Sequence, residues 1–158
     1  MTTIPTALEA SASTFARGGR REDRGRRLLA EGSDGAAAVL VVDDNDFFRH
    51  GMVRAVQREA GMELVGEADS GEAALAAIER LRPDLVLLDY QMPGLDGLGV
   101  LRRLAEAQPR PSCRIVLVSA ALDDEVERAA RASGAVACIG KDTPRTQICA
   151  EALRLARQ

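Results

Sequence analysis

The chain has 158 residues, a hydrophobic content of 46% and a formal net charge of −3, which fit one domain with a buried core and some chain left over. The small negative charge argues against a nucleic-acid-binding surface over the whole chain, and the 3% aromatic content argues against stacking platforms for single-stranded nucleic acid. No apolar run approaches the length of a membrane span, and the first residues lack the pattern of a charged region, an apolar stretch and a cleavage site, so we expect neither a membrane span nor a secretory signal. The three cysteines form no Cys-x-x-Cys pair and fit reduced core residues of a cytoplasmic protein.

Residues 1–36 differ in composition from the rest of the chain. They show no sustained hydrophobic periodicity and include the arginine-rich run 17–27. We predict a disordered, arginine-rich extension there, followed by one folded domain over residues 37–158. A basic arm for an acidic partner or nucleic acid is one interpretation of the run, and a solvated tail or a start codon assigned too far upstream is the simpler one.

From residue 38 onward, short apolar runs alternate with helical patterns. The expected strands span residues 38–43, 63–67, 84–89, 114–119 and 135–140. The expected helices span residues 46–59, 71–81, 97–107, 123–132 and 144–157. Ser70 and Asp96 are placed to cap two of these helices, and Gly134 is placed to stop a third. Five strands alternating with five helices predict an α/β fold, with a five-stranded parallel, doubly wound sheet covered by helices on both faces.

Polar side chains follow four of the five predicted strands. They are Asp43 and Asp44 after the first strand, Asp89 at the end of the third, Ser119 at the end of the fourth and Lys141 after the fifth. Ligands of such sheets bind beyond the carboxyl ends of the strands, so we expect these residues to meet at one edge. Lys141 is the only lysine among 21 basic residues, which suggests that a compact ammonium is required at this position.

Crowded carboxylates raise one another's pKa unless a cation holds them. Oxygen donors without a neighbouring histidine or cysteine favour Mg²⁺ over zinc. The chain has no Gly-Lys-Ser/Thr phosphate loop and no Gly-x-Gly-x-x-Gly turn. Asp89, alone on a middle strand, is therefore the best nucleophile candidate, and Lys141 is placed to stabilise phosphoryl oxygens. The pattern predicts a site for a divalent metal and a phosphoryl group.

The stretches that carry these residues resemble the receiver domain of bacterial two-component response regulators. Over about residues 37–157 the matching stretches are Val41–Asp44, Leu87–Asp89, Met92–Gly97, Val118–Ala120 and Gly140–Lys141. The resemblance implies a flavodoxin-like fold and a phosphoacceptor signalling function. Asp89 would accept a phosphoryl group from the phosphohistidine of a sensor histidine kinase or phosphotransfer protein, with Mg²⁺ as cofactor.

The same resemblance implies how the metal is held. Asp44, Asp89 and the main-chain carbonyl of Gln91 would bind Mg²⁺ directly, whereas Asp43 would act through a metal-bound water. A haloacid-dehalogenase-like phosphatase also uses a strand-end aspartate, but it needs a second acid two residues later. Gln91 stands at that position, so the dedicated-enzyme interpretation is disfavoured.

The resemblance also implies roles around the phosphoryl group. Ser119 would hydrogen-bond a phosphoryl oxygen, and Lys141 would pair with the phosphate. The domain would assist its own phosphorylation and dephosphorylation, and the small, neutral Ala121 predicts fairly free entry of water. Two departures stand out: Asp142 follows the lysine where most receivers have a proline after a cis bond, and Cys138 replaces a frequent aromatic residue.

Lys141–Asp142 and the stretch Asp44–Arg49 with Gly51 are similar to the NarL/FixJ-type receivers. We interpret Cys138 as core packing and His50, the only histidine, as a surface residue.

No output domain follows the last predicted helix, so we expect a single-domain regulator, with a receiver fragment of a DNA-binding transcriptional regulator as one alternative. Its output would be protein contact through the face formed by residues 123–132, 135–140 and 144–157, and the resemblance allows a phosphorylation-dependent homodimer. We expect no membrane association and no direct DNA binding. The other alternative is a phosphorylation-independent pseudo-receiver, which the complete set of site residues disfavours.

Overall fold

The structure, a computed structural model, describes residues 35–158. The predicted disorder of residues 1–36 lies outside the described residues, except for the last two positions. Within residues 35–158, no helix is long and apolar enough to cross a membrane.

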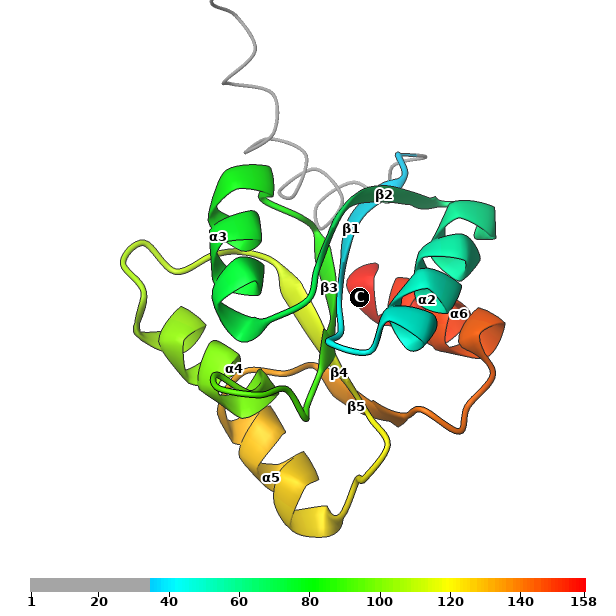
Figure 1. The fold of residues 1–158 in the computed structure, drawn as a ribbon. Helices are drawn as coiled ribbons and strands as arrows, with labels where there is room; N and C mark the ends of the chain where they lie inside the picture. The colour runs from blue at the N-terminus through cyan, green and yellow to red at the C-terminus, as the bar shows by residue number, and fades with distance from the viewer. Residues whose placement is uncertain (1–34) are drawn as a thin grey trace, which may run out of the picture.

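The described chain forms one five-stranded sheet with strand order β2-β1-β3-β4-β5 and parallel pairing throughout (Figure 1). The strands are β1 (Ala37–Val42), β2 (Met62–Ala68), β3 (Leu85–Asp89), β4 (Arg114–Ser119) and β5 (Ala137–Gly140). The helices are α2 (Asp46–Arg58), α3 (Gly71–Leu81), α4 (Gly97–Glu106), α5 (Asp124–Ala132) and α6 (Arg145–Ala156). The predicted fold class is confirmed.

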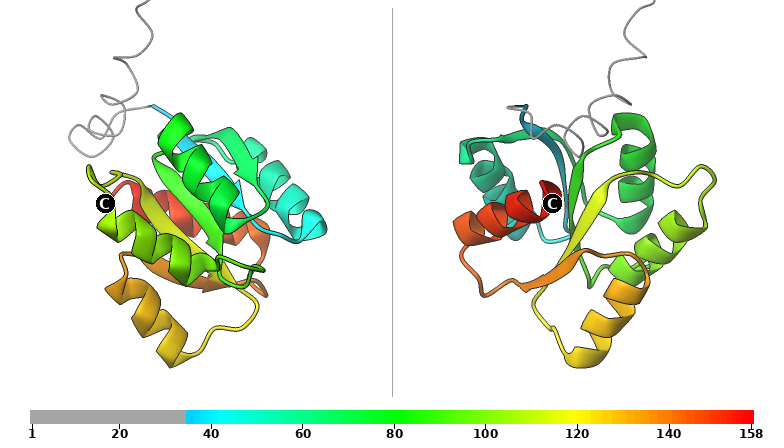
Figure 2. Two further views of the ribbon diagram at one scale, coloured as in Figure 1. Left: turned by 60° about the vertical axis from the view of Figure 1, so that its left-hand side comes forward. Right: turned by 180° about the vertical axis from the view of Figure 1, so that it is seen from behind.

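Helices cover both faces of the sheet. Helices α2 and α6 lie on one face, and α3, α4 and α5 lie on the other (Figures 1 and 2). Each face has its own apolar core: Met52, Val56 and Ile148 pack on the first side, and Ile78 and Leu101 on the second. Because both faces are covered, the central strands are continuous apolar runs rather than alternating ones.

Short-range signals fix the helix ends. Ser70 accepts a hydrogen bond from the main-chain N–H of Ala73, and Asp96 accepts one from Gly99, so both predicted caps are present. Gly134 ends the turn after α5 with a φ of +108°, a conformation that suits glycine. The strand predicted at 135–140 begins only at Ala137, because the preceding residues close the turn after α5.

Strand β2 contains a bulge. The pairing with β1 passes from Leu64 directly to Gly66, so Val65 has no partner in the register. Met62 and Leu64 therefore face the α2–α6 core, whereas Ala68, an even number of residues further on, faces the opposite core. The extra residue inverts the alternation of the strand just before the loop at the carboxyl edge.

Candidate functional site

The carboxyl edge of the sheet gathers the predicted site residues. Asp43 follows β1 and Asp89 ends β3, and these two strands are neighbours in the sheet. Ser119 ends β4, and its main-chain carbonyl accepts a 2.8 Å hydrogen bond from the N–H of Lys141, which follows β5. Asp43, Asp89 and Ser119 are each at most 2% exposed, so the site is built from side chains withdrawn from water.

Lys141 bridges two of the carboxylates. Its Nζ lies 2.7 Å from Oδ2 of Asp43 and 3.1 Å from Oδ1 of Asp89. Burial lowers the pKa of the ammonium, but the hydrogen bonds and negative charges of the two carboxylates outweigh burial and raise the pKa above its usual value. The lysine is therefore a permanent positive charge in the site.

Asp89 has an unusual environment for a carboxylate. Burial is the largest cause that raises its pKa, to about 7, followed by the charge of Asp43, while Lys141 acts in the opposite direction. Its Oδ2 atom is buried and has no hydrogen-bond partner among the described residues. The exposed Asp44 carboxyl can share a hydrogen bond with Asp89 only while one of the two groups is protonated.

The three aspartates fit a divalent cation. Asp43, Asp44 and Asp89 each offer a carboxylate oxygen, and these oxygens lie within 4.8 Å of one another. Lys141 pairs with only two of these three carboxylates, and the unpartnered Oδ2 of Asp89 is available as a metal ligand. Hard oxygen donors of this kind suit Mg²⁺, which keeps part of its water shell.

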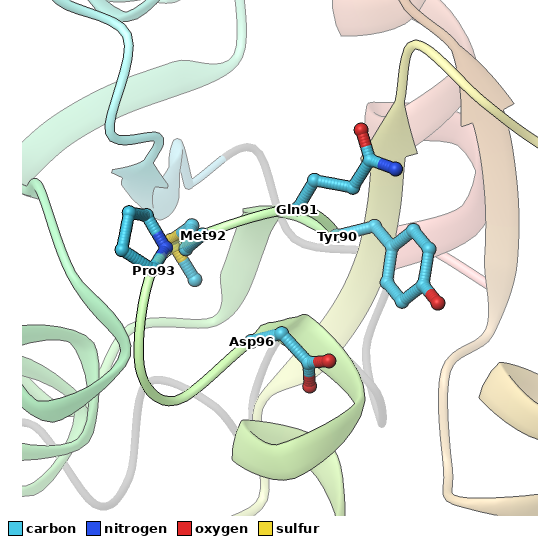
Figure 3. Close-up of a pocket in the computed structure, with 5 residues that line it drawn as sticks. All are labelled: Tyr90, Gln91, Met92, Pro93 and Asp96. Carbon is cyan, nitrogen blue, oxygen red and sulfur yellow. The ribbon is translucent and has the colours of Figure 1, made fainter.

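Gln91, the remaining predicted metal ligand, lies in the loop after β3. Five residues of this loop line an open hollow of about 400 Å³: Tyr90, Gln91, Met92, Pro93 and Asp96. The Gln91 side chain projects away from Asp96 (Figure 3). The proposed ligand is the main-chain carbonyl, so the exposed side chain does not argue against it. Its metal-binding role stays a prediction.

The loop is held against β3 by a glycine. Gly97 donates a 2.8 Å hydrogen bond to the carbonyl of Tyr90. A Cβ at Gly97 would lie 2.5 Å from the carbonyl oxygen of Asp89 and 2.9 Å from Cα of Tyr90. The close approach of α4 to the end of β3 therefore requires glycine at this position.

Arg49 organises the loop after β1, a role that its place in the sequence does not indicate. It is 8% exposed and donates from Nη1 to the main-chain carbonyl of Asp43 at 2.8 Å. Its other nitrogens bind Asp46 at 2.7 Å and Glu67 on β2 at 3.2 Å. Asp43 also accepts a 2.8 Å hydrogen bond from the N–H of Asn45 through Oδ1. Arg49 thus ties the acidic loop to the edge strand.

The remaining predicted residues lie around this centre. The hydroxyl of Ser119 accepts a 3.1 Å hydrogen bond from the N–H of Ala121, which is exposed. His50 is exposed on α2, as predicted. Cys138 is half-buried against the α3–α5 core, where burial raises its pKa, and it forms no disulfide. After Lys141 the chain turns through a 3.1 Å hydrogen bond from Thr143 N–H to the Gly140 carbonyl.

Comparison with known proteins agrees with this geometry. Residues 39–153 match the family described as "Response regulator receiver domain". The chain belongs to this family. Receiver domains are phosphoacceptor signalling domains of two-component systems, and the predicted resemblance is confirmed.

Individual relatives support the same assignment. The transcriptional regulatory protein NarL of Mycobacterium tuberculosis (strain H37Rv) is 40% identical over 119 residues, which are 75% of this chain and 54% of that protein. A protein-glutamate methylesterase/protein-glutamine glutaminase of Myxococcus xanthus is 45% identical over 106 residues, which are 66% of this chain and 30% of that protein. This chain therefore spans about half or less of these relatives.

Solved receiver structures superimpose well on the described fold. The signal receiver domain of NarL from M. tuberculosis gives a TM-score of 0.73 at 37% identity, covering 78% of this chain and 98% of that one. The response regulator domain of Thermotoga maritima CheB gives a TM-score of 0.68 at 28% identity, covering 78% of this chain and 95% of that one. These similarities extend over nearly the whole described part of the receiver.

Proposed function

We propose that this receiver accepts a phosphoryl group on Asp89 from the phosphohistidine of a sensor histidine kinase or phosphotransfer protein. The observation that carries the proposal is the environment of one carboxylate. Asp89 is buried at the end of β3, with Oδ1 bound to Lys141 and Oδ2 without a partner. The negative charge of Asp89 is only partly compensated by Lys141. Its unpaired oxygen is therefore available to attack phosphorus, and binding a cation would stabilise the carboxylate.

The transfer balances without any further reactant. A carboxylate oxygen of Asp89 attacks the phosphorus, and an O–P bond forms while the P–N bond to the donor histidine breaks. The electron pair of that bond leaves on the imidazole nitrogen. The hydroxyl of Ser119 donates a hydrogen bond to a phosphoryl oxygen, and Lys141 compensates the negative charge that the new group brings to the site.

The metal assignment is the one that the resemblance to receiver domains implies. Asp44, Asp89 and the main-chain carbonyl of Gln91 would bind Mg²⁺ directly, and Asp43 would act through a metal-bound water. The bound cation supplies positive charge that offsets the clustered carboxylates and the phosphoryl oxygens. The three aspartates of this set each offer a carboxylate oxygen, and these oxygens lie within 4.8 Å of one another, which supports their part of the assignment.

The domain assists its own chemistry in both directions without being a dedicated enzyme. In dephosphorylation a water attacks phosphorus, the O–P bond to Asp89 breaks and the carboxylate leaves with the electron pair. Inorganic phosphate departs, and the proton lost by the water passes to solvent. The exposed Ala121 beside Ser119 presents little bulk to obstruct that water. We infer a short phosphoryl lifetime, and a lifetime of many hours would count against it.

The signal then passes by protein contact. We assign the output to the surface of α5, β5 and α6, where a downstream protein or a second phosphorylated copy of the domain would bind. We propose a cytoplasmic location, since a histidine kinase delivers its phosphoryl group there. The proposal includes no direct contact with DNA or membrane.

Intact mass after incubation with acetyl phosphate and Mg²⁺ tests the phosphoacceptor. The wild-type chain should gain one phosphoryl group, Asp89→Asn should gain none, and EDTA should prevent the gain. Asp123→Asn is the matched control, because asparagine keeps the cap that Asp123 provides for α5. An adduct on Asp89→Asn would refute the site. No adduct on any variant, with acetyl phosphate or a donor kinase, would favour a pseudo-receiver that acts through its binding surface alone.

A further inference from the structure

Two adjacent phenylalanines begin α2, and they have different environments. Phe47 is 78% exposed. Phe48 is half-buried and packs against the core between the sheet and helices α2 and α6. The Nζ atom of Lys141 lies 4.5 Å from the centroid of the Phe48 ring. The one lysine of the chain therefore contacts an aromatic ring as well as two carboxylates.

A second cation shares this ring. The guanidinium carbon of Arg145, the first residue of α6, lies 5.0 Å from the Phe48 centroid and 5.6 Å from the Phe47 centroid. The Nε of Arg145 is buried and lacks a hydrogen-bond partner within the described part of the chain. The guanidinium of Arg145 thus packs on the faces of the two aromatic rings, while its buried Nε makes no hydrogen bond to any described residue.

Gly51 makes room for the arginine. It lies three residues after Phe48 on α2, so the two positions share one side of the helix. A Cβ at Gly51 would lie 2.5 Å from Nε and 2.7 Å from Cζ of Arg145. The glycine lets the guanidinium lie against the helix and over the same ring that Lys141 contacts.

We propose that Phe48 is a positioning residue that holds the Lys141 ammonium over the phosphoacceptor site. The inference rests on the proposed function of Asp89. A lysine has a flexible four-carbon stem, and its two carboxylate partners both lie at the metal-binding cluster. The face of an aromatic ring attracts a partly desolvated ammonium and adds no oxygen acceptor.

This contact has a specific use during phosphoryl transfer. Lys141 must exchange part of its pairing with Asp89 for a phosphoryl oxygen, whereas its contact with Phe48 involves no reacting atom. The ring can therefore keep the ammonium in place while its oxygen partners change. An aliphatic side chain of similar size would fill the same space but would not attract the cation.

The single lysine makes the contact directly observable by NMR. The full chain is labelled with lysine carrying ¹³C at Cε, which gives one side-chain signal, and wild type is compared with Phe48→Leu and Phe48→Tyr. Phe48→Leu should remove the ring-current shift of the Lys141 Hε protons, and Phe48→Tyr should retain it. Phe47→Leu is the matched control and should leave the signal unchanged. An unchanged Lys141 shift in Phe48→Leu would overturn the proposal.

The phosphorylation rate with acetyl phosphate at saturating Mg²⁺ is the second readout. Phe48→Leu should slow it roughly three- to tenfold, and Phe48→Tyr should restore it. Replacement of Phe48 by pentafluorophenylalanine keeps the ring but reverses its charge distribution, and it should slow the reaction even if the leucine variant folds poorly. A fluorinated variant as fast as wild type, or a tyrosine variant as slow as leucine, would refute the positioning role. If wild type itself is not phosphorylated, the proposed function fails, while the Lys141 signal still decides whether the ring holds the ammonium.

Discussion

Lys141 and Asp43 form a buried ion pair at the carboxyl edge of the sheet, with 2.7 Å between Nζ and Oδ2 and side chains that are 17% and 3% exposed. The pair is shorter than the 3.1 Å contact between Lys141 and Asp89. In the absence of metal, the positive charge of Lys141 therefore offsets the repulsion between the buried carboxylates and stabilises the folded domain.

Lys141→Met should destabilise the metal-free domain by about 3–5 kcal/mol at neutral pH, because it leaves buried carboxylates without their cation. Added Mg²⁺ should recover part of the loss by binding the same carboxylates. Urea unfolding with EDTA and with Mg²⁺ measures both effects. Equal losses in the two conditions would show that packing of the lysine stem, rather than its charge, dominates.

The pKa of Asp89 predicts how stability varies with pH. Its folded value of about 7 lies above the ordinary value of 3.8, so the folded state keeps a proton that the unfolded state releases. The contribution of Asp89 to stability is therefore complete below about pH 4 and is lost as the pH rises through about 7. Without metal, Asp89→Asn should become progressively more stable than wild type over this interval, measured by urea unfolding. A difference that is independent of pH would contradict the raised pKa.

Magnesium binding should depend on the protonation of the Asp89 carboxyl group. Because metal binding needs the ionised carboxylate, the apparent Kd for Mg²⁺ should fall about tenfold from about pH 6 to about pH 8, and little above that. Tyr90 is the only tyrosine, lies beside Asp89 and is accompanied by no tryptophan, so its fluorescence is a convenient probe. A Kd that does not change with pH would mean that no proton competes with the metal at Asp89.

Arg49→Ala should cost about 1–3 kcal/mol, since it removes the buried donor to the Asp43 carbonyl together with two ion pairs. Arg54→Ala on the exposed side of the same helix is the matched control and should change stability by less than about 0.5 kcal/mol. Arg49→Ala should also weaken Mg²⁺ binding, because the loop that carries Asp43 and Asp44 loses its anchor. Similar losses in both variants would argue against a specific role for Arg49.

Gly97→Ala should destabilise the domain by about 1–3 kcal/mol, because the new methyl group meets main-chain atoms of Asp89 and Tyr90. Gly99→Ala, two residues later in α4, places its methyl group 2.5 Å from the end of the flexible Leu95 side chain. That variant should be near neutral, since alanine favours a helix more than glycine does. Thermal unfolding of the two variants separates the backbone contact from helix propensity.

Much of the fold follows from local patterns in the sequence. Apolar runs, helix periodicity and the caps at Ser70 and Asp96 act over a few residues, and every predicted element end lies within two residues of the observed one. The convergence of Asp43, Asp89 and Lys141 followed from the rule that parallel strands present their carboxyl ends at one edge.

Long-range contacts were beyond such patterns. Arg49 on α2 pairs with Glu67 on β2, and Phe48 contacts Lys141, which is far from it in the sequence. In the sequence, Phe48 reads as one more core position of an amphipathic helix, and Arg49 as an ordinary charge beside it. Only the packing of α2 against β2 and α6 reveals these contacts.

The bulge at Val65 makes one residue of β2 dispensable for its pairing with β1. Removing Val65 would restore regular alternation and leave Glu67 and Ala68 on their present faces, because the pairing already passes from Leu64 to Gly66. Removing Glu67 instead would turn Ala68 away from its core and take away a partner of Arg49. Deletion of Val65 should therefore be far less damaging than deletion of Glu67.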